Sequence, residues 1–589
     1  MPVVESAVVR VLCALAAALV SAFAHAQDAT SPVCVERDPP ATVRSSVTAR
    51  HFMVSAAHPL AADAGYRVLK QGGSAVDAAI TVQLVLGLVE PQSSGIGGGA
   101  FMLVHDAARN KLIAYDGRET APAAARPDQF LDASGKPIEL LSAVLGGKSV
   151  GVPGVIALLA ETHRKHGRLP WARLFAPAIE LAEKGFPVSH RLCAVIAREP
   201  AMPQARAYQY FHDANGTPLA TGTLRKNPEY AAALREIAAR GAPAFYTGRI
   251  ARDVVDTVAT SPVNPGVMTM EDLARYRVVV REPVCAPYRG YRVCGVPLPT
   301  SGGLVVLQML GMLEPYDLAA MGPLSMWSVH FFTEAGRLAY ADRERYMADP
   351  AFAPPPAGLV DRDYVAARST LIRTDASMGR AAPGKPRGVA DGRGPDYGMH
   401  PALELPSTSH FSIVDRYGNA VAMTTSIEYS FGSRLMTASG FLLNNELTDF
   451  SFLPTRDGKP VANRIEGGKR PRSSMSPTIV YDKSGRLFMI TGSMFGPTIP
   501  NQVAKTLVAV IDWKLDPQAA VTLPNFGSRN GPTELERDTA AAALAPKLQA
   551  LGHDTVLTGH NGGAHAIVRT RNGWSGGADP RREGDVRGD

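Results

Sequence analysis

The chain of 589 residues has few cysteines, little excess charge and only one apolar run, at its N-terminus. Its formal net charge is +7, and the 61 lysines and arginines are scattered among 54 acidic residues. Nucleic-acid binding needs a concentrated basic surface, so the sequence predicts no such partner. Beyond the N-terminus, no segment reaches the roughly 18 apolar residues of a transmembrane helix, which predicts no membrane span in the processed protein.

Several catalytic and metal-binding motifs are also missing. There is no P-loop, no H-E-x-x-H, no paired C-x-x-C and no G-x-S-x-G nucleophile elbow. The glycine-rich loop 95–99 (GIGGG) follows a helical pattern rather than a strand, so close backbone packing explains it better than dinucleotide binding. His560 and His565 (HNGGAH) have no third ligand nearby, so we expect a turn there and no metal.

Residues 1–26 have the pattern of a secretory signal peptide. Arg10 precedes a short apolar run over residues 11–23, and the small residues Ala24 and Ala26 fit a cleavage site. The alternative is a membrane anchor, but the run is too short to cross a hydrocarbon core of ~30 Å comfortably. We therefore expect a periplasmic or secreted protein.

Removal of the signal leaves four of the 5 cysteines, an even number that suits an oxidising compartment. Cys285 and Cys294 flank a short segment that contains Arg289-Gly290. If these two residues form a hairpin turn, Cys285 lies directly opposite Cys294, at a spacing that suits a disulfide. The pattern therefore predicts a Cys285–Cys294 disulfide.

Apolar periodicity and turn residues predict a mixture of helices and strands. We expect helices over 59–71, 74–89, 154–166, 171–184, 326–347, 501–513 and 538–551, and strands over 100–104, 111–115, 408–415 and 420–426. Residues 374–406 are rich in glycine, proline and arginine, which is typical of a linker.

A hydroxyl residue, Thr408, begins a strand directly after this linker. If the bond before it is cut, Thr408 carries both a hydroxyl and a free α-amine. The pKa of such an amine lies near neutrality, so it can accept the hydroxyl proton and activate the nucleophile. From the pattern alone, the β-propensity of threonine is the simpler explanation.

Motifs that occur in one family's order along almost the whole chain, from about residue 48 to 582, favour the nucleophile over simple β-propensity. The sequence resembles the γ-glutamyltranspeptidase family of N-terminal-nucleophile hydrolases in VSAAHPLAADAGYRVLKQGGSAVDAA (54–79), EPQSSGIGGGAFMLV (90–104), YDGRETAP (115–122), PTSGG (299–303), TSHFSIVDRYGNAVAMTTSIE (408–428), FGS (431–433), NNELTDFS (444–451), KRPRSSMSPTIV (469–480) and TGSMFGPTI (491–499).

The resemblance implies an α+β fold, a four-layer αββα sandwich formed jointly by two chains after self-cleavage between Ser407 and Thr408. The large subunit would span residues 27–407 and the small subunit residues 408–589. Thr408 would attack γ-glutamyl amides such as glutathione and pass the acyl group to water, an amino acid or a dipeptide. No metal or organic cofactor is implied, because the nucleophile carries its own base.

The resemblance also assigns the substrate site. Arg118 would hold the α-carboxylate of the donor, and Glu446 with Asp449 its α-ammonium. The rest of the pocket would consist of Ser426, Glu428, Ser473 and Ser474. Taken singly, these residues have simpler explanations: a surface salt bridge for the arginine, a solvated loop for the two acids, and a helix cap for the serine pair.

One departure from the family pattern lies in the oxyanion loop, assigned to Phe495 and Gly496. Phe495 stands where the family has a glycine, and it would be strained if that position needs φ > 0. Two alternatives follow: an acylase of the same fold for another acyl group, such as glutaryl, or a relative that binds γ-glutamyl peptides without turnover. Three carboxylates, Glu428, Glu446 and Asp449, argue for a donor that carries an ammonium.

Overall fold

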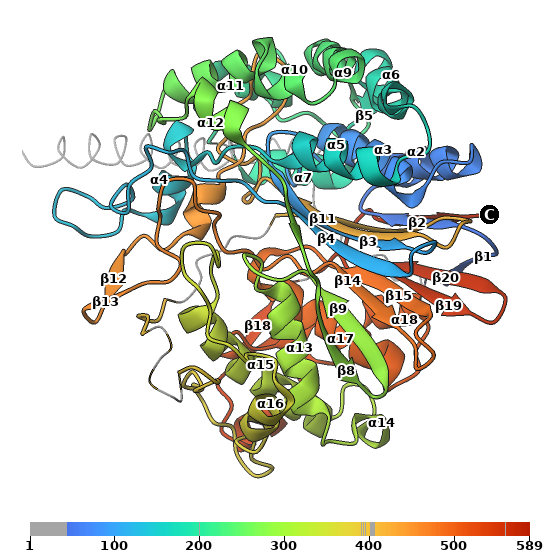
Figure 1. Cartoon of the computed structure of the whole chain (residues 1–589), viewed down its shortest axis with the longest axis vertical. Helices are drawn as coiled ribbons and strands as arrows, with labels where there is room; N and C mark the ends of the chain where they lie inside the picture. The colour runs from blue at the N-terminus through green and yellow to red at the C-terminus, as the bar shows by residue number, and fades with distance from the viewer. Residues whose placement is uncertain are drawn as a thin grey trace, which may run out of the picture.

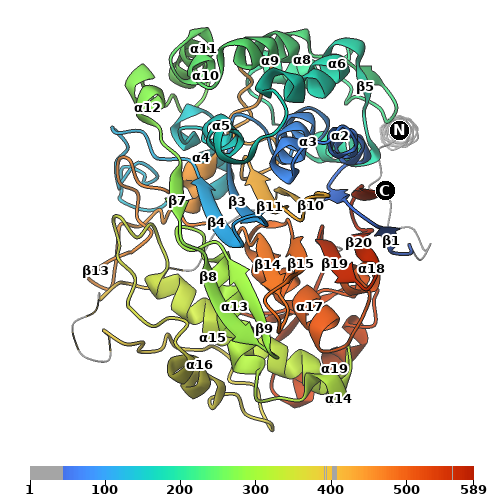
Figure 2. The same cartoon turned by 45° about the vertical axis from the view of Figure 1, so that its right-hand side comes forward.

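The computed structural model describes residues 44–199, 201–389, 392, 394, 396–400, 407–559 and 561–589. Two seven-stranded sheets stack face to face, and helices cover the outer face of each (Figures 1 and 2). This is the predicted α+β fold with four αββα layers. The signal peptide predicted over residues 1–26 and the histidine at 560 lie outside the described residues.

The upper sheet in Figure 1 places the candidate nucleophile at its centre. Its strand order is β21 (Asp585–Gly588), β2 (Met53–Ala56), β10 (Ser409–Val414), β11 (Ala420–Ser426), β3 (Gly99–Asp106), β4 (Lys111–Gly117) and β7 (Val279–Arg281), with antiparallel neighbours throughout. Strand β10 therefore pairs on one side with β2, from the start of the chain, and on the other with β11.

The lower sheet has the order β1 (Val47–Ala49), β20 (Gly573–Ala578), β19 (His565–Thr570), β15 (Leu487–Gly492), β14 (Thr478–Tyr481), β9 (Tyr291–Gly295) and β8 (Val284–Tyr288). The β8–β9 hairpin carries the Cys285–Cys294 disulfide, and these two residues are direct register partners. Arg289 and Gly290 form the turn with positive φ of 51° and 82°. The predicted turn and disulfide are confirmed.

Each helical layer packs its apolar side chains on one sheet. The upper layer includes α2 (Pro59–Lys70), α3 (Ala75–Val89), α5 (Val155–His166), α6 (Ala176–Lys184) and α9 (Pro228–Arg240), and the lower layer includes α13 (Gly302–Leu313), α15 (Met326–Tyr346), α17 (Ile499–Ile511) and α18 (Pro517–Thr522). Alternation along β10 sends Phe411 and Ile413 into the upper core. Its opposite face, including buried His410, meets the other sheet.

The described part of the chain contains further α-helices and strands. They are α4 (Leu140–Val144), α7 (His190–Arg198), α8 (Ala205–Phe211), α10 (Pro243–Tyr246), α11 (Arg249–Ala259), α12 (Met270–Arg275), α14 (Leu318–Met321), α16 (Arg362–Ser369), α19 (Ala545–Ala550), β5 (Phe186–Pro187), β6 (Leu224–Arg225), β12 (Thr455–Arg456), β13 (Lys459–Pro460), β16 (Phe526–Gly527), β17 (Thr533–Glu536) and β18 (Thr555–Thr558). None of the helices in the described part of the chain is both long and apolar enough to span a bilayer.

Two helix predictions were wrong in their extent, each because of a proline. The helix expected over 538–551 is only α19, preceded by a 3-10 turn at Ala542–Leu544, and that expected over 171–184 divides into a 3-10 turn at Trp171–Phe175 and α6. Pro546 and Pro177 lie in the first turns of α19 and α6, where their missing N–H costs nothing. Farther inside a longer helix, each proline would break a hydrogen bond.

Candidate active site

Ser407 and Thr408 lie in the middle of the upper sheet, immediately before β10, and are only 3% and 4% exposed. The Thr408 hydroxyl lies 2.6 Å from the carbonyl oxygen of Ser407, and the Ser426 hydroxyl donates a hydrogen bond of 2.9 Å to the same oxygen. Two hydroxyls therefore converge on the peptide bond that the sequence analysis named for cleavage, and they polarise its carbonyl.

A network of hydroxyls and one buried acid supports this peptide bond from the loop after α3. The Ser407 hydroxyl donates to the carbonyl of Gln92 over 2.7 Å, and the Ser409 hydroxyl donates to Glu90 Oε2 over 2.8 Å. Burial raises the pKa of Glu90 to about 7, although nearby Arg191 acts in the opposite direction. The sequence analysis assigned no role to Glu90 or Ser409, although both lie in segments that carry the family resemblance.

A small cavity opens beside Thr408. The sequence-predicted residues that line it are Arg118, Ser407, Thr408, Ser426, Glu428, Glu446, Asp449, Ser473, Ser474 and Gly496, joined by Met475 and Ile499. The structure thus brings the predicted site residues together from six separate parts of the chain. Phe495 is the one predicted member that does not line the cavity.

Arg118, just after β4, is 1% exposed and forms ion pairs with Glu446 and Asp449. Both acids belong to a 3-10 turn, Glu446–Asp449, which carries them to the guanidinium from the other side of the cavity. Burial alone would lower the pKa of Arg118, but the two carboxylates outweigh it and raise that pKa. Burial excludes the surface salt bridge and the solvated loop as explanations.

Glu119 is a further acid at this site that the sequence analysis missed, although it follows Arg118 in the same motif. Its carboxylate is buried, and Oε2 lies 3.8 Å from Arg118 Nη1. Burial and then the charge of Glu446 raise the pKa of Glu119 well above its ordinary range. Gly99 makes room for this carboxyl group, because a Cβ there would lie 2.3 Å from Glu119 Oε2. A side chain at position 99 would therefore displace this carboxyl group.

Ser473 and Ser474 present their side chains near the same cavity. The Ser474 hydroxyl accepts a hydrogen bond of 2.8 Å from Arg343 Nη2, and the Ser473 hydroxyl accepts one of 3.1 Å from the Met475 backbone. No helix follows, since the next element is strand β14 at Thr478. The helix-cap alternative for these two serines is therefore wrong.

The segment that the resemblance assigns to the oxyanion loop has a strained backbone at Phe495, because this position does need φ > 0. Phe495 adopts φ 104° and ψ 51°, a left-handed conformation, and is followed by a 3-10 turn over Gly496–Thr498. For a side chain with a Cβ, this conformation costs of order 1–3 kcal/mol. The ring of Phe495 faces away toward the Arg582 guanidinium, 5.5 Å from the ring centroid, and Gly496 alone borders the cavity.

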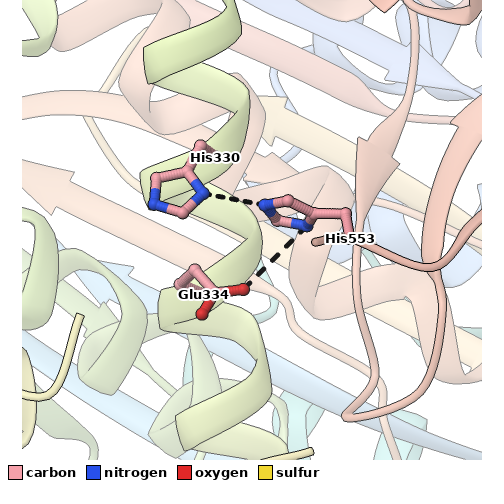
Figure 3. Close-up of side chains that lie close together, drawn as sticks. All are labelled: His330, Glu334 and His553. Atoms are coloured by element: carbon pink, nitrogen blue, oxygen red, sulfur yellow. Dashed lines mark hydrogen bonds and ion pairs between the residues drawn. The ribbon is translucent and has the colours of Figure 1, made fainter. Parts of the chain in front are cut away.

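A second group of titratable residues lies in the lower layers (Figure 3). His330 and Glu334 project from one face of α15, and His553 approaches from the loop before β18, so that His330 Nδ1 and His553 Nε2 are 2.7 Å apart. Glu334 accepts hydrogen bonds from Arg337 and from the segment after α16. The ring nitrogens and carboxylate oxygens that could bind a metal already form hydrogen bonds within the protein, and Arg337 adds a positive charge beside them. The group is therefore better suited to joining segments than to holding a cation.

The family model described as gamma-glutamyltranspeptidase matches residues 61–588. The chain is 37% identical over 509 residues to the glutathione hydrolase proenzyme of Bacillus subtilis (strain 168), which covers 85% of this chain and 84% of that one. It is 34% identical over 550 residues to the acylase ACY 1 proenzyme of Pseudomonas sp. (strain V22). That alignment covers 91% of this chain and 93% of the acylase. The solved cephalosporin acylase of Bacillus halodurans superposes with a TM-score of 0.81 at 28% identity, covering 94% of this chain and 99% of that one.

Proposed function

Because the chain belongs to the γ-glutamyltranspeptidase family, we propose that it cuts itself before Thr408 and then uses that residue to transfer γ-glutamyl groups. The observation that carries the proposal is the pair of hydroxyls, from Thr408 and Ser426, on the carbonyl oxygen of Ser407. The nucleophile is already beside the bond it must break.

Self-cleavage proceeds by an N→O acyl shift. Thr408 Oγ1 attacks the carbonyl carbon of Ser407, the C–N bond breaks, and the hydroxyl proton passes to the nitrogen, which leaves Ser407 as an ester on Thr408. Water then hydrolyses this ester, so that Ser407 ends in a carboxylate and Thr408 carries a free hydroxyl and a free amine. The free amine is the general base for the next reaction.

In that reaction, the donor is a γ-glutamyl amide with a zwitterionic head. Its α-carboxylate suits the planar guanidinium of Arg118, and its α-ammonium suits Glu446 and Asp449. These three side chains pair with one another before substrate binds, so the donor replaces one set of buried ion pairs by another. Thr408 then takes the γ-acyl group as an ester, and water, an amino acid or a dipeptide removes it.

A second candidate is an acylase for a group such as glutaryl, since named relatives include acylases of this fold. The charges favour the first function. One arginine faces Glu446, Asp449 and Glu428 across the cavity, so the pocket has an excess of negative charge. A glutaryl donor lacks the ammonium that would neutralise it. A binding protein without turnover is the third candidate.

We also propose that the protein is exported, to the periplasm or the medium. The Cys285–Cys294 disulfide supports this location, because such bonds persist in oxidising compartments.

The test is intact mass and N-terminal sequencing of the purified protein, followed by assays with γ-glutamyl and glutaryl 4-nitroanilides. We expect two fragments, the smaller beginning Thr408-Ser409-His410, and release of nitroaniline from the γ-glutamyl compound. A single uncut chain would contradict the proposal. Cleavage with turnover of only the glutaryl compound would favour the acylase, and cleavage with no turnover would favour the binding protein.

A further inference from the structure

A second cavity lies next to the catalytic one and has no role in the function proposed above. It offers more space than the cavity beside Thr408, and its lining includes Tyr340, Arg343 and Glu344 of α15, Arg380, Pro497 and Arg529. It is also richer in arginine than the cavity that contains Thr408.

The two cavities share a wall. Gly496 lines the catalytic cavity and the next residue, Pro497, lines the second one, while the Tyr340 hydroxyl donates to the carbonyl of Pro497. On another side, Ser474 lines the catalytic cavity and receives the hydrogen bond from Arg343, which lines the second. The second cavity therefore begins one residue beyond Gly496, on the other side of the wall of the catalytic cavity.

The charges in the second cavity leave an excess of one positive charge. Arg343, Arg380 and Arg529 face two acids, Glu344 and Glu534. Arg529 lies 2.6 Å from Glu534, so this pair is neutral. Arg380 is 67% exposed at its side chain and lies 3.9 Å from Glu344, at the limit of an ion pair. A ligand carboxylate can therefore approach Arg380 from solvent.

Arg380 is held in place although its side chain is exposed. The carbonyl of Gly379 accepts a hydrogen bond of 2.6 Å from Arg337, and the backbone of Ala381 exchanges two hydrogen bonds with the side chain of Asn530. Both neighbours of Arg380 are thus fixed, and its guanidinium is presented at the mouth of the cavity without large loss of backbone entropy on binding.

We propose that the second cavity is the subsite for the amine partner of the reaction, and that Arg380 binds the C-terminal carboxylate of that partner. This inference rests on the proposed function. The partner is the peptide that leaves the donor and also the amino acid or dipeptide that accepts the acyl group. Both occupy one subsite, because attack by an amine on the acyl-enzyme is the reverse of acylation by the corresponding amide.

The test compares amines with and without a carboxylate in the processed enzyme. Donor KM is measured for glutathione, whose leaving dipeptide carries a carboxylate, and for γ-glutamyl 4-nitroanilide, which has none. Acceptor KM is measured for glycylglycine and for glycylglycinamide. In Arg380→Gln, we expect KM for glutathione and glycylglycine to rise about 3- to 10-fold, with little change for the nitroanilide and the amide. Arg380→Lys should retain part of the affinity.

Arg387→Gln is the matched control, because Arg387 is similarly exposed on the same segment but pairs with Asp361. It should leave all four KM values unchanged. If Arg380→Gln changes KM equally for glutathione and the nitroanilide, and equally for glycylglycine and its amide, or changes none of them, the subsite is overturned. The proposed function would remain intact. Wild-type enzyme that turns over neither donor would overturn both.

Discussion

The hydroxyl of Ser426 donates a hydrogen bond of 2.9 Å to the carbonyl oxygen of Ser407, across the gap between the end of β11 and the start of β10. The same Ser426 oxygen accepts a hydrogen bond of 2.8 Å from the Glu428 backbone, which fixes its orientation. In the proposed self-cleavage, negative charge would develop on the Ser407 oxygen as Thr408 attacks. Ser426 is therefore placed to stabilise that charge.

Replacing Ser426 by alanine should slow self-cleavage about 100-fold, because one preorganised donor to the developing oxyanion is lost. The rate is measured by following the precursor band of freshly purified protein over time on a denaturing gel. Ser426→Thr keeps the hydroxyl and should cleave at a rate near that of the wild type. Equal cleavage rates in the alanine variant and the wild type would show that the hydrogen bond has no part in the reaction.

Glu446→Gln should weaken binding of donors that carry an α-ammonium. The loss of a buried charge beside Arg118 should raise KM for γ-glutamyl 4-nitroanilide by about 10-fold or more. KM for a glutaryl anilide, which lacks the ammonium, should not rise with it. Glu466→Gln is the control, since Glu466 pairs with Lys469 away from the catalytic cavity. If KM rises equally for the γ-glutamyl and the glutaryl anilide, Glu446 does not bind the α-ammonium.

Replacement of Phe495 tests the strain in the oxyanion loop. Both Phe495→Gly and Phe495→Ala remove the ring and its contact with Arg582, but only glycine adopts φ 104° freely. The strain relief exceeds the entropy that glycine gains on unfolding, so we expect the glycine variant to be about 1 kcal/mol more stable than the alanine variant. Urea unfolding of both proteins provides the comparison; a more stable alanine variant would contradict it.

The His330–His553 pair should make the fold sensitive to acid. Burial, then the charges of His330 and Arg337, lower the pKa of His553 to about 3. The unfolded chain binds this proton near pH 6.5, so the stability contribution is complete above that pH and is lost as pH falls toward 3. At pH 5 the loss is about 2 kcal/mol. In the His553→Gln variant, position 553 has no titratable group, so this contribution is absent.

Urea unfolding of the wild type and of His553→Gln at pH 7.5 and pH 5 measures this contribution. The fall in stability between the two pH values should be smaller in the variant by about 2 kcal/mol. Buried histidines that do not contact His553, such as His105 and His400, titrate in both proteins and cancel in the difference. An equal fall in both would mean that His553 keeps an ordinary pKa.

Local signals in the sequence sufficed for much of the fold. The helix start at Ser74 follows from its capping box with Asp77, and the disulfide hairpin follows from a two-residue turn. Contacts between residues far apart in the chain left no such signal. Glu119 lies beside Glu446, and His330 beside His553, only in the folded structure, because each pair is more than 200 residues apart in the sequence. The site residues came from family resemblance, because no single one differs locally from an ordinary surface residue.

Strands from before and after residue 407 pair directly with one another in both sheets: β10 lies against β2, β11 against β3, β14 against β9 and β20 against β1. A cut before Thr408 leaves every one of these pairings in place, yet it removes the covalent link that keeps the partner strands at high effective concentration. In the proposed self-cleavage, folding would therefore have to precede cutting. Once denatured, the two pieces of a cut protein would become separate solutes with unpaired strand edges, and its native state would survive by slow unfolding rather than by ready reassembly.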